Sequence, residues 1–192
     1  MENITIKTNR KISYTKKVLR DSLIEIMKTT PITNISIKDI CTLADISRST
    51  FYTYYKNQYD LLQKTQEETF AYFEDILNKY SNRNSNYEII QKITQMIEEL
   101  LLYIANNNNF IQILLSENGD VNFQKRLLRR YYKQAERLFH KKTLTDKTRE
   151  YYSVFEVNGT IGLIQHWLKN NMDVPIHELA VILTKLSVPA DL

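Results

Sequence analysis

The sequence predicts an all-α protein of about nine helices. Glycine and proline occur only three times each in 192 residues, which is too few for the many turns of a sheet-rich fold. Apolar residues instead recur at the spacing of a helix face, and 43% hydrophobic content is enough for a packed core. We expect an N-terminal three-helix unit over residues 1–60 and a helical body over residues 61–192.

The N-terminal segment, residues 1–13, carries basic side chains without any apolar period. We therefore expect a flexible basic arm, which either reaches the backbone or minor groove of DNA or is a plain disordered terminus. Thr15 is expected to cap the first helix, which would end near Thr29 because Pro31 follows.

Residues 36–59 are typical of two short helices joined by a tight turn. Ser36 can cap the first helix, and Asp39 stands three residues later, where a capping box needs an acceptor. Asp45 and Ile46 form the turn, and Ser47 can cap the second helix.

The second of these helices has two different faces. Phe51 and Tyr55 are four residues apart and are expected to face inward. The outward face would then carry Arg48, Ser49, Tyr52 and Thr53. Donors of this kind suit base edges and phosphates in a DNA major groove, although an ordinary helical hairpin with a polar outer face is an alternative.

The net charge of +4 lies entirely in the part that contains these two helices. Residues 1–60 hold ten Lys and Arg against six Asp and Glu, whereas residues 61–192 hold sixteen of each kind. A concentrated positive charge favours a polyanion as the partner of the N-terminal unit.

The run from Ile40 to Tyr55, followed by Asp60-Leu61-Leu62, resembles the helix-turn-helix signature of the TetR family of bacterial transcription regulators. The sequence departs from that signature at Ser49, where the family often has Gly, and at Gln58, where it usually has a phosphate-contacting Lys. Lys56 could replace the missing lysine. The resemblance implies a homodimer that binds a palindromic operator in double-stranded DNA, most often as a repressor.

The resemblance and the outward face together assign the residues expected to contact DNA. The base edges would be read by Arg48, Ser49 and Thr53. The phosphates would be held by Ser36, Ser47, Tyr52, Tyr54 and Lys56. Thr50 could take either role, and Thr15 belongs to the same set.

The rest of the chain repeats the helical pattern. The body helices are expected over residues 57–80, 87–106, 110–115, 120–142 and 146–169, with a last one from Pro175. Residues 81–86 are polar and are expected to form a linker. Asn118-Gly119 has the residue types of a helix C-cap.

Aromatic residues in the body indicate either a plain core or a ligand cavity. The candidate ligand-binding residues are Tyr72, Phe73, Tyr103, Phe110, Phe123, Tyr131 and Tyr132. Several phenols together indicate either a polar-lined cavity or a wet surface. If there is a cavity, the surplus of glutamates on these helices favours a small apolar effector that is neutral or cationic. The helix over residues 57–80 joins the two parts and would be the lever between effector and DNA.

Two glycines, Gly159 and Gly162, lie inside the helix expected over residues 146–169, where each destabilises the helix by about 1 kcal/mol relative to alanine. A close approach of a second subunit, or of another helix in the same chain, would offset that cost. The segment from Tyr151 to Leu183 resembles the last two helices of TetR-family regulators near the dihydroxyacetone-kinase activator group, which pair as a four-helix bundle. The implied dimerisation residues are Gly159, Gly162, Leu163, His166, Trp167, Leu179 and Leu183. That group also offers an alternative, control by a protein partner without a small-molecule pocket.

Other classes of function lack their signatures in this sequence. The three histidines have no metal-type spacing, Cys41 is the only cysteine, and there is no phosphate-binding loop or nucleophile elbow. No apolar run is long enough for a membrane span, and no signal peptide is present. We therefore expect no catalytic residue, metal or cofactor and a cytoplasmic protein, with a protein-only binding module as the remaining alternative.

Overall fold

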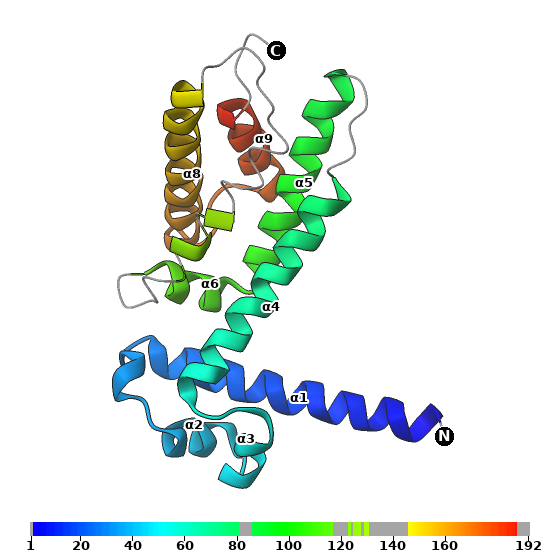
Figure 1. Ribbon diagram of the computed structural model, residues 1–192, viewed down its shortest axis with the longest axis vertical. Coiled ribbons are helices and arrows are strands. Elements are labelled where there is room, and N and C mark those ends of the chain that lie inside the picture. Colours follow the sequence, from blue (N-terminus) through cyan, green and yellow to red (C-terminus); the bar gives the residue numbers. More distant parts are fainter. Residues whose placement is uncertain are drawn as a thin grey trace. The chain divides into compact units, whose positions relative to one another are not determined.

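The structure is a computed structural model that describes residues 2–80, 86–116, 123, 125–127, 129–130 and 146–187 (Figure 1). Across these residues the regular secondary structure is helical and contains no strand, which confirms the all-α prediction. The chain divides into two compact units, and the boundary lies inside helix α4 between Thr69 and Phe70.

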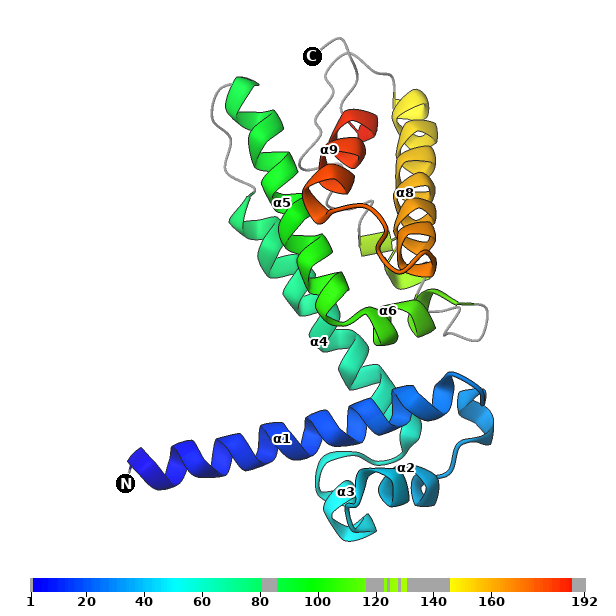
Figure 2. The same ribbon diagram turned by 180° about the vertical axis from the view of Figure 1, so that it is seen from behind.

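The first unit is a small helical domain (Figure 2). It consists of α1 (Glu2–Met27), the short 3₁₀ helix η1 (Ile32–Asn34), α2 (Ile37–Ala44), α3 (Arg48–Tyr54) and the start of α4 (Gln58–Lys79). α2 packs against both α1 and α3. The apolar core side chains with at most 2% of their surface exposed are Leu19, Leu23, Met27, Ile35, Ile40, Phe51 and Leu61.

The N-terminal segment differs from the prediction. Residues 2–13 form the first turns of α1, so the segment expected to be a flexible arm is instead part of a helix. Neither glycine nor proline interrupts this segment, and extending a helix from a packed one avoids the cost of a new nucleus. Thr15 consequently lies inside α1, where it is buried, and does not cap the helix.

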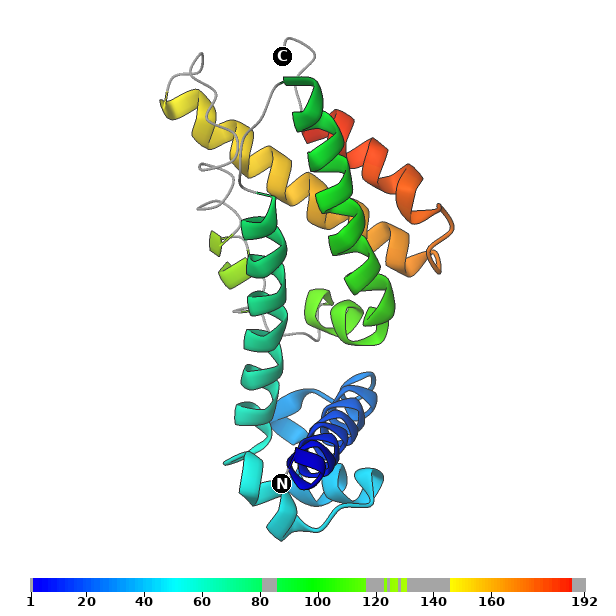
Figure 3. The same ribbon diagram turned by 90° about the vertical axis from the view of Figure 1, so that its right-hand side faces the viewer.

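The second unit contains the rest of α4 together with α5 (Asn86–Asn106), α6 (Asn108–Leu115), α8 (Asp146–Lys169) and α9 (Ile176–Ser187). α5 packs along α9, and α6 packs against α8 (Figure 3). The described residues between Phe123 and Arg130 are helical. Most of the predicted linker at residues 81–86 and the predicted cap at Asn118-Gly119 lie outside the described residues.

Side-chain amides connect α6 to α8. The Gln165 Nε2 group donates to the Leu115 carbonyl oxygen at 2.7 Å, and the Gln112 Nε2 group donates to the Leu168 carbonyl oxygen at 2.9 Å. These bonds satisfy carbonyls at the C-terminal ends of both helices, which have no partner within the helix itself. They therefore fix how α6 and α8 cross.

The turn between α8 and α9 buries Trp167. The Met172 N–H donates to the Trp167 carbonyl oxygen at 2.8 Å, and the Trp167 indole N–H donates to the Val174 carbonyl oxygen at 2.7 Å. Asn171 and Met172 adopt left-handed φ angles of 55° and 59°, which lets the chain reverse here.

Three of the residues expected at the dimer seam are instead covered by the chain itself. Trp167, Leu179 and Leu183 expose only 3%, 5% and 2% of their surface. They fill the space between α8, α9 and their neighbours and are therefore not available to a second subunit. Apolar spacing alone does not say which of two helix faces meets a partner.

The glycines lie on an exposed face of α8. A Cβ atom placed on Gly159 or Gly162 would meet no atom of another described element within 4 Å, so no tight contact with the described part of the chain accounts for either glycine. Phe155 and Tyr151 precede Gly159 at helical spacing and expose 71% and 68% of their surface. Within the described structure, α8 thus presents an exposed face of apolar and small residues.

We predict that Ser36→Ala lowers the free energy of unfolding by about 1 kcal/mol, because it removes the side-chain cap of α2. Thr42→Ala, an exposed hydroxyl on the same helix, is the matched control and should leave the melting temperature nearly unchanged. Thermal denaturation followed by circular dichroism measures both, and equal melting temperatures for Ser36→Ala and the wild type would contradict the role of the cap.

Candidate nucleic-acid interface

α2 begins with the predicted capping box. The Asp39 backbone N–H donates to the Ser36 hydroxyl at 3.2 Å, and the Ser36 backbone N–H donates to the Asp39 carboxylate at 3.1 Å. The Ser36 hydroxyl also donates to that carboxylate at 2.6 Å. Hydrogen bonds from the Ser36 hydroxyl and backbone lower the pKa of Asp39 below its usual value. The start of α2 is therefore fixed by local bonds.

The turn between α2 and α3 is as tight as predicted. Asp45 adopts the left-handed conformation, with φ 51° and ψ 44°, and the Ile46 N–H donates to the Cys41 carbonyl oxygen at 3.0 Å. Aspartate tolerates this conformation better than most residues because its short side chain can bond locally. The reversal leaves only three residues between the end of α2 and the start of α3.

The N-terminus of α3 is surrounded by hydroxyl groups. The Thr50 N–H donates to the Ser47 hydroxyl at 3.2 Å, which confirms Ser47 as the cap. The Ser47 hydroxyl also lies 2.9 Å from the hydroxyls of Ser49 and Thr50. These groups surround a helix N-terminus, which favours a negatively charged ligand such as a phosphate.

Two aromatic residues hold the inner face of α3. Phe51 is fully buried and Tyr55 exposes 5% of its surface, with the two ring centroids 5.6 Å apart. Burial raises the pKa of the Tyr55 hydroxyl to about 12, and the nearby Glu68 and Asp60 carboxylates add to the effect. The ring of Tyr52 meets Phe51 edge-on and remains 58% exposed. α3 is thus oriented by its aromatic side.

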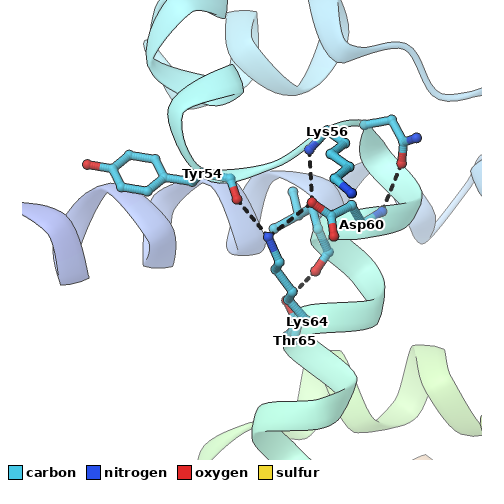
Figure 4. Close-up of polar contacts among 7 residues, drawn as sticks. Tyr54, Lys56, Asp60, Lys64 and Thr65 are labelled. Carbon is cyan, nitrogen blue, oxygen red and sulfur yellow. Dashed lines mark hydrogen bonds and ion pairs between the residues drawn. The ribbon is translucent and has the colours of Figure 1, made fainter.

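The C-terminus of α3 is fastened to the start of α4 (Figure 4). The Lys64 ammonium donates to the Tyr54 carbonyl oxygen at 2.9 Å and to the Asp60 carboxylate at 3.1 Å. The same carboxylate accepts the Lys56 backbone N–H at 2.9 Å. Lys64 also lies over the ring of Tyr55, 5.3 Å from its centroid. We refer to Lys64, Asp60 and the backbone groups that they hold as the α3–α4 clamp.

Most of the predicted DNA-contacting side chains are accessible. The exposed ones are Ser36, Ser47, Arg48, Ser49, Tyr52, Thr53 and Lys56, and the half-buried ones are Thr50 and Tyr54. Thr15 is buried inside α1, so its proposed contact with DNA is wrong. Thr15 was expected at the start of the helix, where its hydroxyl would be exposed, but its position inside α1 buries that hydroxyl.

Sequence reasoning missed two features of this surface. One is the clamp, which the four-residue spacing of Asp60 and Lys64 could have indicated. The other is Lys16 on α1, whose ammonium lies 6.0 Å from the centroid of the Tyr54 ring. Lys16 is exposed and adds a cation beside the outward face of α3.

The second unit contains a cavity of about 480 Å³. Of the aromatic residues predicted to line it, Phe73 and Phe123 do, whereas Tyr72, Tyr103 and Phe110 do not. The ring of Tyr72 stacks on Tyr103 with centroids 4.2 Å apart, and Phe110 is buried within α6. Tyr131 and Tyr132 lie outside the described residues.

The walls of this cavity are mainly aliphatic. They include Ile93, Ile97 and Leu100 of α5 and Ile161 and Ile164 of α8. A helical period does not distinguish cavity walls from a filled core, which is why the sequence did not single them out. The volume lies in the range typical of small-molecule sites, roughly 300–1,000 Å³.

The charges near the cavity also differ from the prediction. Among its described lining residues the charged ones are Glu74 and Arg130, which pair at 2.8 Å. Glu98 instead pairs with His177, and Glu99 accepts from Lys79 at 2.8 Å. The surplus of glutamates counted along the helices therefore does not face the cavity, and the basis for expecting a neutral or cationic ligand is lost.

Other kinds of site find no support in the described part of the chain. No group of three or more His, Cys, Asp or Glu side chains could hold a metal ion there. None of the helices in that part is long and apolar enough to cross a membrane.

Comparisons with known proteins agree with this geometry. A family model described as "Transcriptional regulator C-terminal region", of the TetR series, matches residues 91–188. The HTH-type dhaKLM operon transcriptional activator DhaS of Lactococcus lactis subsp. lactis is 32% identical to this chain over 103 residues. That alignment covers 54% of this chain and 50% of DhaS, so it spans about half the length of the relative.

Solved structures share the fold over nearly the whole chain. The dihydroxyacetone kinase operon activator DhaS superposes with a TM-score of 0.56 and 21% identity, covering 90% of this chain and 93% of that one. The transcriptional regulator FadR from Bacillus subtilis, solved in complex with stearoyl-CoA, gives a TM-score of 0.64 and 15% identity, covering 90% and 97%.

The clamp should make stability depend on pH. The backbone hydrogen bond from Lys56 and the hydrogen bond and charge of Lys64 lower the pKa of Asp60 below its usual 3.8. A carboxyl group with a lowered folded-state pKa stabilises the fold above its ordinary pKa, and this contribution is lost as the pH falls through the folded value. Asp60→Ala should therefore lower the melting temperature at neutral pH, and the difference from the wild type should shrink below pH 3.8.

The matched control is Gln63→Ala, an exposed position on the same helix, which should show no such pH dependence. Melting curves at a series of pH values provide the measurement. A difference between Asp60→Ala and the wild type that stays constant down to acid pH would show that the ionised carboxylate does not hold the clamp.

Proposed function

This chain belongs to the TetR family of transcriptional regulators, and from that premise we propose that it binds a palindromic operator as a homodimer through α3. The main support for this proposal is the difference between the buried and the exposed face of α3. Phe51 and Tyr55 are buried on the inner face, so that Arg48, Ser49 and Thr53 are presented outward together. A helix with base-reading donors on an exposed face and phosphate-binding groups at its N-terminus fits a major groove.

Two kinds of contact are expected on this surface. Arg48 can form a bidentate pair with a guanine edge, while the hydroxyls of Ser49 and Thr53 reach neighbouring bases. Ser47, Tyr52 and Lys56 would hold phosphates and set the register. The Thr53 hydroxyl donates to the Ser49 carbonyl oxygen at 3.1 Å, so it would exchange that bond for one to a base.

The exposed face of α8 supports a homodimer. Phe155, Gly159, Gly162 and His166 follow one another at helical spacing and are all exposed. α9 adds Ile182 and Leu186, which expose 38% and 57% of their surface. A two-fold contact through these residues would cover an apolar surface and would explain the two glycines.

The cavity supports control by a small molecule. It is preformed in the described structure and its walls are apolar, as in small-molecule sites generally. α4 carries Asp60 and Lys64 of the clamp and also Phe70, Phe73 and Glu74 of the cavity wall. A ligand that binds one arrangement of α4 better than another would alter DNA affinity by that difference.

The relatives give two precedents for control. DhaS is a transcriptional activator, and the FadR structure contains an acyl-CoA. We propose small-molecule control because of the cavity, with control by a protein partner as the alternative. Repression is the simplest consequence of occupying an operator, and a reporter that falls rather than rises when the gene is deleted would show activation instead.

We predict that Arg48→Ala weakens operator binding by about 1 to 3 kcal/mol and relaxes the preference at one base pair, because it removes base readout. Tyr52→Phe should instead weaken all duplexes alike, because a phosphate contact carries no sequence information. Gel-shift titrations at fixed salt against specific and random duplexes distinguish the two. If neither variant changes DNA affinity, the assignment of α3 as the reading helix is wrong.

We further predict that Gly162→Leu separates the subunits and abolishes operator binding together. The Cβ position at Gly162 is open within the chain, and leucine is about 1 kcal/mol better than glycine inside a helix, so the isolated subunit should fold at least as well. Gly162→Ala, which adds a single methyl group, is the matched variant and should have a smaller effect. Light scattering reports the mass, and a wild type that is monomeric at micromolar concentration would exclude the dimer.

A further inference from the structure

The mouth of the cavity is marked by an ion pair. Glu74 on α4 and Arg130 are its charged lining residues within the described structure, and the Glu74 Oε1 and Arg130 Nη1 atoms are 2.8 Å apart. Their side chains are 55% and 38% exposed, whereas Phe70, Phe123 and Val157 in the wall are almost completely buried. Because both side chains line the cavity and are also partly exposed, we infer that the pair lies at its entrance.

The two charges are held differently. The Arg130 guanidinium lies 4.3 Å from the centroid of the Phe70 ring, which is itself stacked on Phe123 with centroids 4.9 Å apart. This contact between a cation and an aromatic face does not depend on Glu74. The Glu74 carboxylate is the more exposed partner, and an exposed ion pair contributes little to stability. Another anion can therefore replace the carboxylate while Arg130 stays in place.

We propose that the cavity binds an amphiphile with an apolar tail and an anionic head, and that Arg130 exchanges Glu74 for that head. The planar guanidinium suits a carboxylate or a phosphate, to which it can donate two parallel hydrogen bonds. A cationic head would pair with Glu74 but would stand beside the fixed charge of Arg130. The proposal rests on the cavity being the effector site of the proposed function.

The test compares three probes with the same straight chain and different heads, each below its micellar concentration or its solubility limit. Dodecanoate, dodecanol and dodecyltrimethylammonium are titrated against the full-length protein by displacement of an environment-sensitive dye. Dodecanoate should bind most tightly. Arg130→Met should lower the affinity for dodecanoate by roughly tenfold or more and leave dodecanol nearly unaffected, because only the charged head uses the guanidinium.

Neighbouring residues provide matched controls. Arg129→Met removes an exposed arginine next in the chain and should leave all three affinities unchanged. Glu74→Gln should raise the affinity for dodecanoate, because the head no longer competes with a charged carboxylate, whereas Asp75→Asn should not. The expected gain in Glu74→Gln keeps the test decisive if Arg130→Met fails to fold.

Several outcomes would overturn the proposal. The first is a preference for dodecyltrimethylammonium that Glu74→Gln abolishes. The second is an equal loss of affinity for dodecanoate and for dodecanol in Arg130→Met. The third is that none of the three probes binds. Operator titration with and without dodecanoate separates this proposal from the function. If dodecanoate binds through Arg130 but operator affinity is unchanged, only the effector role is refuted. If the protein binds the operator but none of the three amphiphiles, only the ligand class is refuted.

Discussion

The burial of Phe51 and Tyr55 on one side of α3 is the constraint on which the candidate DNA surface depends. A helix of seven residues is too short to be stable alone, so its orientation must come from packing. The two aromatic rings supply that packing, the Ser47 cap fixes one end, and the α3–α4 clamp fixes the other. With both ends and the inner face fixed, the polar face can only point outward.

The clamp also connects α4 to the proposed regulation. Its first turns hold the carbonyl of Tyr54 through Lys64, and its later turns carry Phe70, Phe73 and Glu74 into the cavity wall. A single helix therefore carries the side chains that fasten α3 and the side chains that would contact a ligand. Under the proposed mechanism no new contact is needed between effector and DNA, only a different preference for the arrangement of α4.

Much of the fold and of the candidate DNA surface could be predicted from the sequence because the signals are local. The caps at Ser36 and Ser47, the turn at Asp45 and the inward pair of Phe51 and Tyr55 depend on residues within four positions of one another. The cavity and the proposed dimer face depend on which of two apolar helix sides is covered, and this is set by distant segments. The predicted ligand-binding residues were chosen largely because they are tyrosines, but Tyr72 and Tyr103 stack on each other outside the cavity wall.

The most direct test of the account is selection of binding sites from random duplex DNA by the purified full-length protein. A dimer that presents two copies of α3 should enrich an inverted repeat, with half-site centres about 34–36 Å apart, one turn of DNA, or a multiple of that spacing. Binding should weaken steeply as salt rises, because phosphate contacts release counterions. Enrichment of a sequence without two-fold symmetry, or no enrichment at all, would contradict the claim that α3 reads an operator as part of a homodimer.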